Sequence, residues 1–162
     1  MLEFKPLSQE GIEPALRKAD HYRLLNEPWE ADSICRDILA IDPRNQRALV
    51  TLILALTEQF GEEGGVDEEE PRQLLQQLES EYEQVYYAGI ISERWAKERL
   101  RHGTLGCGPV AFEYLRNAME WYERAERLSP PGDDDALLRW NTCARLIRRN
   151  KLRPPPRPRE AL

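Results

Sequence analysis

The sequence predicts an all-helical protein built from antiparallel helix pairs. Leu, Ala, Glu and Arg, which favour helices, outnumber β-branched residues, and the 162 residues include only 9 glycines. Apolar residues recur at helical spacing in most segments, and no alternating run predicts a convincing strand. Hydrophobic residues make up 41% and charged residues 32%, which is typical of a thin helical array whose layers each keep a solvated face.

Three helices are expected in the first half of the chain. Apolar and small residues at helical spacing predict them over 12–25, 29–41 and 46–60. Pro28 and the turn at 42–45 separate these helices, because proline disfavours helix in the residue before it. Trp29 and Cys35 are expected among the buried side chains, and the nearly apolar third helix should be the most buried. The segment 61–70, with three glycines and six acids, predicts a loop.

The second half predicts four more helical segments. Pro71 suits the first turn of a short helix that ends near Ser80. A helix over 81–101 should follow after a turn near Ser80–Gln84, and Gly89 should weaken its middle. The glycine-rich segment 102–109 predicts a second loop. The last two helices are expected over 110–128 and 133–150.

These elements predict one helical repeat domain over 12–150. A short N-terminal lead over 1–11 precedes it, and a disordered, Pro- and Arg-rich tail over 151–162 follows it. The net charge of −6 is unevenly placed, since residues 139–159 contain eight Arg or Lys and no acid. Residues 1–138 hold 28 acids against 15 bases and therefore carry about −13.

The chain is predicted to be a reduced, cytoplasmic protein. Its three cysteines are an odd number at wide spacing, which does not describe a disulfide framework. The N-terminal residues have no basic stretch followed by an apolar one, so no secretory signal is visible. The longest apolar run, 48–56, is about half the length that a membrane crossing needs.

Two segments match one another when Pro43 is aligned with Pro130. Both segments contain a small residue, a bulky residue four positions later, and a smaller residue three positions after that. A proline follows five positions further on. The aligned pairs are Ala31 with Ala118, Cys35 with Tyr122, and Ile38 with Ala125. This pattern resembles the second helix of a tetratricopeptide repeat, in which small residues let two helices approach closely.

The resemblance to the tetratricopeptide repeat family covers about residues 12–149. It implies an antiparallel helix-pair, right-handed superhelix of about three repeats plus a C-terminal capping helix. The repeats are divergent and expanded by loops at 61–70 and 100–109, as in a small bacterial-type member of the family. The rival interpretation is an unrelated helical bundle that shares the same spacing.

The resemblance implies a protein–protein interaction module or adaptor that holds a peptide or helix of a partner protein in a concave groove. Members that bind chaperone tails clamp a terminal carboxylate with Lys and Asn, where this chain has Leu16 and Asp20, so that ligand is not expected. The resemblance is compatible with either a monomer or a homo-oligomer. The positions that the family would turn toward the groove are Leu16, Asp20, Arg23, Val50, Leu54, Thr57, Tyr86, Ile90, Glu93, Arg94, Leu138, Thr142 and Arg145.

No catalytic, metal or cofactor site is predicted. None of the 29 acids stands in an apolar context that would raise its pKa for acid–base work. The acids of 61–70 lack the spacing of a calcium loop, and two histidines are too few for zinc. A dyad of Cys107 with His102 has no third group. The glycines of 103–108 meet neither nucleotide-binding pattern, so a flexible connector is the better interpretation.

The alternative function uses the basic C-terminal helix and tail. Eight positive charges within residues 139–159 could contact an anionic partner such as nucleic acid, with an affinity that falls as salt rises. The acidic body would repel phosphates, and no aromatic residues are interleaved with the arginines of the tail, so nucleic acid is the less favoured partner.

Overall fold

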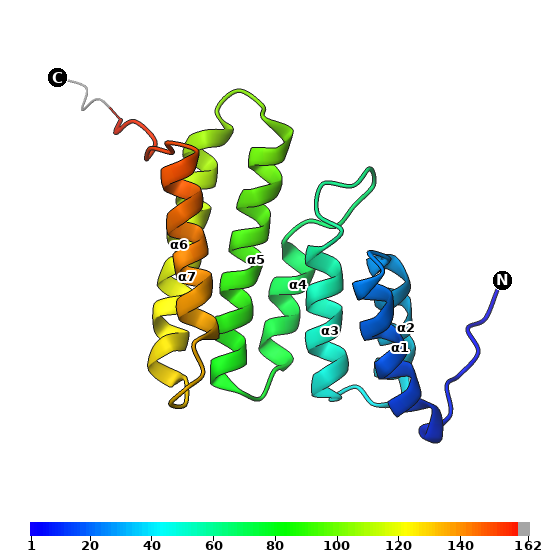
Figure 1. Cartoon of the computed structure of the whole chain (residues 1–162). Helices are drawn as coiled ribbons and strands as arrows, with labels where there is room; N and C mark the ends of the chain where they lie inside the picture. The colour runs from blue at the N-terminus through cyan, green and yellow to red at the C-terminus, as the bar shows by residue number, and fades with distance from the viewer. Residues whose placement is uncertain (159–162) are drawn as a thin grey trace. The chain divides into compact units, whose positions relative to one another are not determined.

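A computed structural model describes residues 1–158 of the chain (Figure 1). Within these residues the secondary structure is helical, apart from one isolated β-bridge between Phe60 and Val66. The prediction of an all-helical fold is therefore confirmed. None of the helices found in residues 1–158 has both the length and the apolar composition that a membrane crossing requires.

The chain divides into two compact units, Met1–Ser80 and Glu81–Leu162. The first unit contains η1 (Gln9–Gly11), α1 (Ile12–Leu24), α2 (Pro28–Ile41), α3 (Gln46–Thr57), α4 (Glu69–Leu74) and η2 (Leu75–Gln77). The second contains α5 (Glu81–His102), α6 (Cys107–Leu128) and α7 (Asp135–Arg149).

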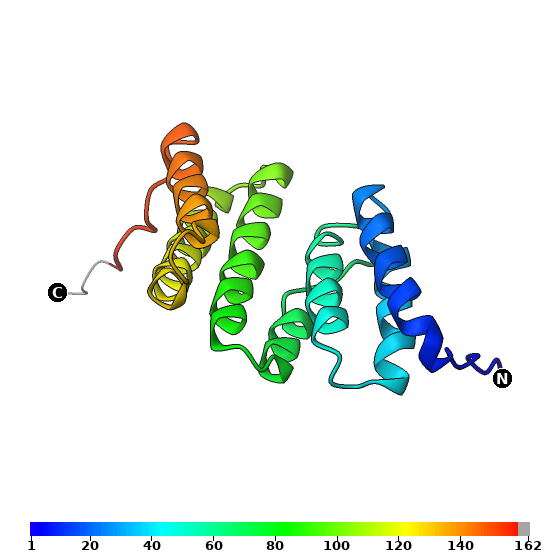
Figure 2. The same cartoon turned by 60° about the horizontal axis from the view of Figure 1, so that its bottom comes forward.

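In the first unit α2 packs against both α1 and α3 (Figure 2). Pro28 stands at the start of α2, where its missing N–H costs no helical hydrogen bond. Asn45 begins α3, and its side chain accepts a hydrogen bond from the Ala48 amide at 3.0 Å. Eight of the 12 residues of α3 are buried, as its apolar sequence predicts.

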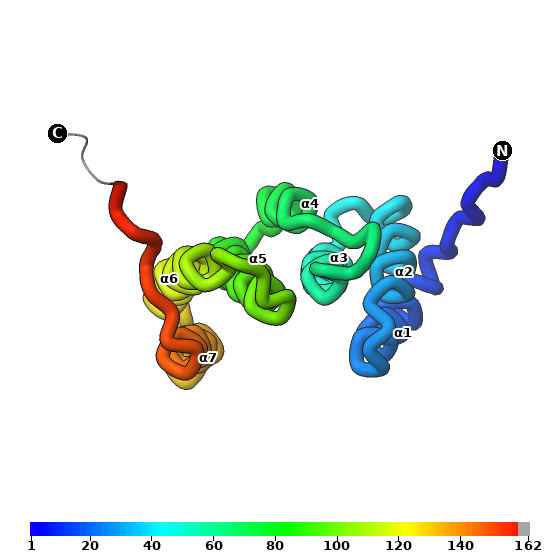
Figure 3. The backbone as a smooth tube through the Cα atoms, turned by 90° about the horizontal axis from the view of Figure 1, so that it is seen from above, coloured from blue at the N-terminus to red at the C-terminus, as the bar shows by residue number. Residues whose placement is uncertain are grey.

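In the second unit α6 contacts both α5 and α7 (Figure 3). The close approach of α5 and α6 depends on Gly89, because a Cβ there would lie 2.5 Å from Cε1 of Tyr122. Gly89 does not interrupt α5, which runs unbroken from Glu81 to His102. The glycine predicted to weaken this helix instead lets it pack.

The six residues aligned between the two matching segments are all fully buried. Each has 0% of its surface exposed, although three lie on α2 and three on α6. The spacing on which the repeat resemblance rests is therefore core spacing in both units. The residues are Ala31, Cys35, Ile38, Ala118, Tyr122 and Ala125.

Several predicted boundaries were wrong. The turn expected near Ser80–Gln84 lies earlier, between η2 and the start of α5 at Glu81. The loop expected over 102–109 is limited to 103–106, because α5 includes His102 and α6 already begins at Cys107. Pro109 fits the first turn of α6, where amides have no partner within the helix.

Trp29 was expected in the core and is 49% exposed. It stands in the first turn of α2, beside the connection from α1, so one side of its ring meets solvent. Leu25, placed in the predicted first helix, is 54% exposed because α1 ends one residue before it.

The N-terminal lead is partly ordered. Ser8 caps η1 by accepting a hydrogen bond from the Gly11 amide at 3.1 Å, and Leu7 packs beside the core residues Leu16 and Ile38. At the other end, residues 152–158 have no helix or strand. Residues 159–162 of the predicted tail lie outside the described residues.

Candidate binding surfaces

In each unit the first and third helices are joined by an ion pair between Arg and Glu. In the first unit Nε of Arg23, on α1, lies 3.1 Å from both carboxylate oxygens of Glu58, which follows α3. In the second unit Nη1 of Arg139, on α7, donates to Oε2 of Glu93, on α5, at 2.9 Å. The charges are exchanged between the two units, but the pair joins corresponding helices in both.

Three of the predicted groove residues of the first unit keep accessible surface without an ion pair. Asp20 is exposed on α1, and its carboxylate accepts a hydrogen bond from Thr51 of α3 at 3.3 Å. Val50 and Leu54 on α3 are half-buried. These residues give the α1–α3 side of the unit a mixed apolar and acidic surface.

The other three predicted groove residues of this unit serve its own structure. Leu16 is 2% exposed and packs with Ile38 and Ala48, so its prediction as a groove contact is wrong. Thr57 is 3% exposed and donates to the Leu54 carbonyl at 2.7 Å, which also removes it from the surface. Arg23 is half-buried in its ion pair with Glu58.

On α5 the predicted groove residues divide in the same way. Ile90 is 1% exposed and Glu93 is 0% exposed, so neither is available to a partner, and both predictions are wrong. The helix α5 packs extensively on α6, and Ile90 and Glu93 lie among its buried residues. Tyr86 and Arg94 remain half-buried and keep some accessible surface.

Glu93 is a buried carboxylate that sequence reasoning missed. Its Oε2 accepts from Nζ of Lys97 at 3.1 Å and from Arg139 at 2.9 Å, and its Oε1 accepts from Sγ of Cys143 at 3.5 Å. The carboxylate is buried, but its direct partners Lys97, Arg139 and Cys143 are charged or polar, so Glu93 does not stand in an apolar surrounding. One signal was available, since Glu93 follows Gly89 by four residues and thus shares its buried helix face.

Two more polar groups complete this buried cluster. The hydroxyl of Tyr122 is buried, and among the described residues it has no hydrogen-bond partner. Burial raises the pKa of Tyr122, and the charge of Glu93 raises it further. Burial and the same carboxylate also raise the pKa of the Cys143 thiol. The cluster therefore stabilises the neutral forms of both groups at neutral pH.

The helix α7 presents the most accessible of the predicted residues. Leu138 is 59% exposed, Thr142 is half-buried and Arg145 is exposed. Their spacing of four and three residues places them on one face of the helix. Arg139, Cys143 and Ala136 lie on other faces, and Cys143 and Ala136 are buried in the unit. The face formed by Leu138, Thr142 and Arg145 is therefore outside the packing of its own unit, and we call it the α7 face.

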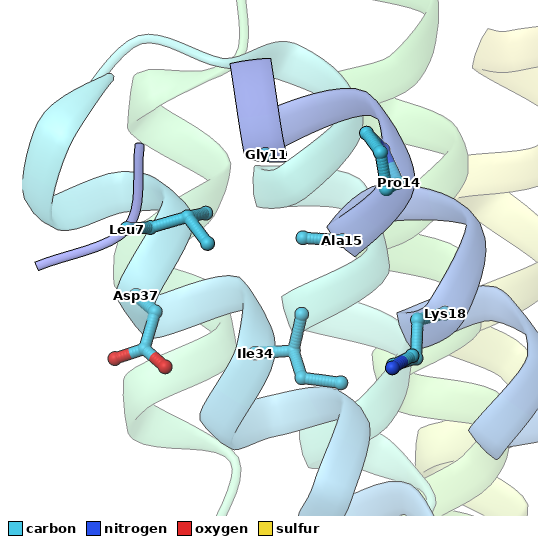
Figure 4. Close-up of a pocket in the computed structure, with 7 residues that line it drawn as sticks. All are labelled: Leu7, Gly11, Pro14, Ala15, Lys18, Ile34 and Asp37. Carbon is cyan, nitrogen blue, oxygen red and sulfur yellow. The ribbon is translucent and has the colours of Figure 1, made fainter. Parts of the chain in front are cut away.

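A small pocket in the first unit was not predicted. It has a volume of about 280 Å³ and lies between the N-terminal lead, α1 and α2. Figure 4 shows Leu7, Ala15 and Ile34 pointing into the same space, with Lys18 and Asp37 at its edge. The only sequence signal was Leu7 directly before the Ser8 cap, a position from which a side chain commonly folds back on the helix.

The histidines and cysteines of the described chain are placed apart from one another or paired with other groups. No group of three His, Cys, Asp or Glu residues there could hold a metal ion. Nε2 of His102 lies 2.6 Å from Glu98, so it pairs with that acid and forms no dyad with Cys107 that the structure records. Cys35 is fully buried, and burial raises its pKa to about 12, which suits a small core residue and not a nucleophile.

Six cations between Arg145 and Arg157 have no ion-pair partner in the part of the chain that the structure describes. Within residues 1–158, no acid lies within ion-pair distance of any of the six, and all of them are exposed. By contrast, Arg139 from the same basic segment is bound to Glu93. The six residues are Arg145, Arg148, Arg149, Lys151, Arg153 and Arg157.

No protein-family model matches the chain, and comparisons with curated proteins and with solved structures found no match either.

Proposed function

We propose that the chain is a protein–protein interaction module of the tetratricopeptide type, which holds a peptide or helix of a partner protein. The observation that carries the proposal is the α7 face, where Leu138, Thr142 and Arg145 stand outside the packing of their own unit. An exposed leucine beside an unpaired arginine is a surface that a partner could cover with both apolar contact and charge.

The first unit supplies a second surface of the same kind. Asp20, Val50 and Leu54 lie on α1 and α3 and keep accessible area, while the charges of Arg23 and Glu58 beneath them are already paired. The internal ion pairs hold the helices in place. Binding of a partner to the residues around them would therefore cost little further conformational entropy.

The mixed character of both surfaces favours an amphipathic partner segment. Leu138, Val50 and Leu54 offer apolar contact, whereas Arg145 and Asp20 offer one charge of each sign. An amphipathic helix that carries an acid opposite Arg145 would satisfy the α7 face. The tetratricopeptide arrangement itself, with about three repeats and a capping helix, is part of this proposal.

Capture of partner proteins from the native cell, quantified by mass spectrometry, tests the proposal. The L138E/R145E variant places two acids on the α7 face and should lose the main partner by at least tenfold. The matched control is L128E/R127E, which changes an exposed leucine and an exposed arginine of α6 in the same way. Equal capture by wild type and both variants would show that the α7 face does not bind the partner.

A further inference from the structure

One end of the second unit collects features that are far apart in the sequence. The end of α5, the 103–106 loop, the start of α6 and the end of α7 all lie there (Figure 1). The contact between Leu152 and Gly108, with Leu152 Cδ2 3.9 Å from the position of a Cβ on Gly108, joins the tail to the first turn of α6. The chain after α7 therefore passes beside the start of α6.

This end is strongly basic. We call it the basic end and define it by Arg148, Arg149, Lys151, Arg153 and Arg157, all of which are exposed and none of which has an ion-pair partner within residues 1–158. No acid occurs in 103–112 or in 139–158. The nearest acid at the end of α5, Glu98, is already bound to Arg101 and His102.

Exposed apolar side chains lie at the same end of the second unit as the basic end. Leu105, at the tip of the 103–106 loop, is 107% exposed, and Val110 in the first turn of α6 is 40% exposed. A nucleic-acid backbone makes its contacts through phosphate and sugar and gains little from an exposed leucine. A protein segment that combines acids with apolar side chains fits this surface better.

The first unit contains a segment with the required charge. It holds 17 acids against 8 bases, a net charge of −9, while the second unit holds 12 acids against 15 bases, a net charge of +3. Within the first unit, Glu62, Glu63 and Glu69 are exposed, and no Lys or Arg of the described residues pairs with them. Val66, in the same segment, packs against the core of the first unit and holds the segment to it.

We propose that the basic end of one copy binds the acidic segment 61–70 of a second copy, so that the chain associates head to tail. The two surfaces are different, so the contact is heterologous and each copy retains a free end of each kind. Repetition of the contact gives a ring or an open chain of copies. This inference does not depend on the α7 face and uses none of its residues.

Sedimentation velocity of the full-length chain over a range of concentrations tests the inference. At about 0.01 M salt, where the screening length is about 30 Å, the wild type should sediment as dimers and larger species. At about 1 M salt, where that length is about 3 Å, it should be a monomer. A wild type that remains monomeric at low salt overturns the inference.

Charge reversal assigns the association to the two surfaces. The R148E/R149E variant and the E62K/E63K variant should each be monomeric at low salt, and an equimolar mixture of the two should form a 1:1 complex. The control K5E/R127E shifts the net charge as much as R148E/R149E does, at exposed positions away from the basic end, and should still associate. Circular dichroism and thermal unfolding verify that every variant is folded.

Two other outcomes contradict the inference. Association that survives R148E/R149E would place the contact elsewhere on the molecule. Binding of a short single-stranded oligonucleotide at low salt, lost in R148E/R149E while the wild type stays monomeric, would show that the basic end is a nucleic-acid surface instead.

Discussion

The ring of Tyr122 lies directly against the backbone of Gly89, where a Cβ would come within 2.5 Å of Cε1 and 2.8 Å of Cδ1. The contact joins α5 to α6, the most extensive helix contact in the second unit. Tyr122 is also the largest of the fully buried side chains. The pair therefore sets how closely the two helices approach.

Replacing Gly89 by alanine should destabilise the second unit by about 1–3 kcal/mol, because the added methyl group would force the Tyr122 ring or a helix to move. The loss should appear although alanine is the better helix former by about 1 kcal/mol. Urea unfolding followed by circular dichroism measures it. Gly108→Ala is the control, since a Cβ there meets only Leu152 Cδ2 at 3.9 Å, and its free energy of unfolding should be unchanged or higher.

Tyr122→Phe should leave stability unchanged or raise it by up to about 1 kcal/mol. The buried hydroxyl has no hydrogen-bond partner among the described residues, so its removal abolishes an unsatisfied group. Tyr86→Phe makes the same chemical change at a hydroxyl whose pKa is raised by burial and lowered in part by the neighbouring Arg139 side chain, and the loss of the interaction with Arg139 should lower stability. If Tyr122→Phe proves to be the more destabilising substitution, the hydroxyl of Tyr122 must have a hydrogen-bond partner, which contradicts this prediction.

Glu93→Ala should cost about 3–5 kcal/mol, because it leaves Arg139 and the Cys143 thiol without the acceptor they share. Glu79→Ala is the comparison, since the ion pair of Glu79 with Arg44 is largely exposed and should contribute no more than about 1 kcal/mol. The two free energies of unfolding, measured in the same urea series, should therefore differ severalfold. Similar values would mean that the buried cluster contributes no more than a surface pair.

Stability should fall as the pH rises above about 9. Burial raises the pKa of Cys35 from 9.0 to about 12, and burial raises that of Tyr82 from 10.0 to about 12. Between those limits the unfolded chain loses protons that the folded chain retains, so the free energy of unfolding decreases with pH. The effect is absent below about pH 9, where both states keep their protons.

Urea unfolding from pH 7 to 11 measures this dependence. The Cys35→Ala and Tyr82→Phe variants should each show a shallower decline at alkaline pH than the wild type, whatever their stability at pH 7. A wild-type curve that stays flat up to pH 11 would contradict the assigned burial of these groups.

The sequence was sufficient for the helical class and for most of the core, but not for the exposure of individual site residues. The repeat spacing placed Cys35 and Tyr122 correctly because one helix face must be buried whatever its neighbours are. It did not place Glu93 in the core, since Lys97 is a helical neighbour on α5 but Arg139, the other cation, reaches the carboxylate from α7, 46 residues further along the chain. That information is tertiary.

The candidate site shows the same limit. Groove positions carried over from a family pattern predict which helix bears a residue, whereas its exposure depends on the packing of the neighbouring helix. Leu16 and Ile90 were therefore predicted at a surface and are buried, while Leu138 and Arg145 are accessible on α7. That the basic end and the 103–106 loop lie at the same end of the second unit is also invisible in the sequence, since it follows from the antiparallel course of α5, α6 and α7.

Oxidative side-chain footprinting of the chain, with and without its captured partner, tests the proposed function most directly. The account predicts that the partner protects Leu138 on the α7 face and also Val50 and Leu54, while Leu24 and Trp29, which are 86% and 49% exposed, react as before. Protection of Leu24 and Trp29 with none at Leu138, Val50 or Leu54 would contradict it.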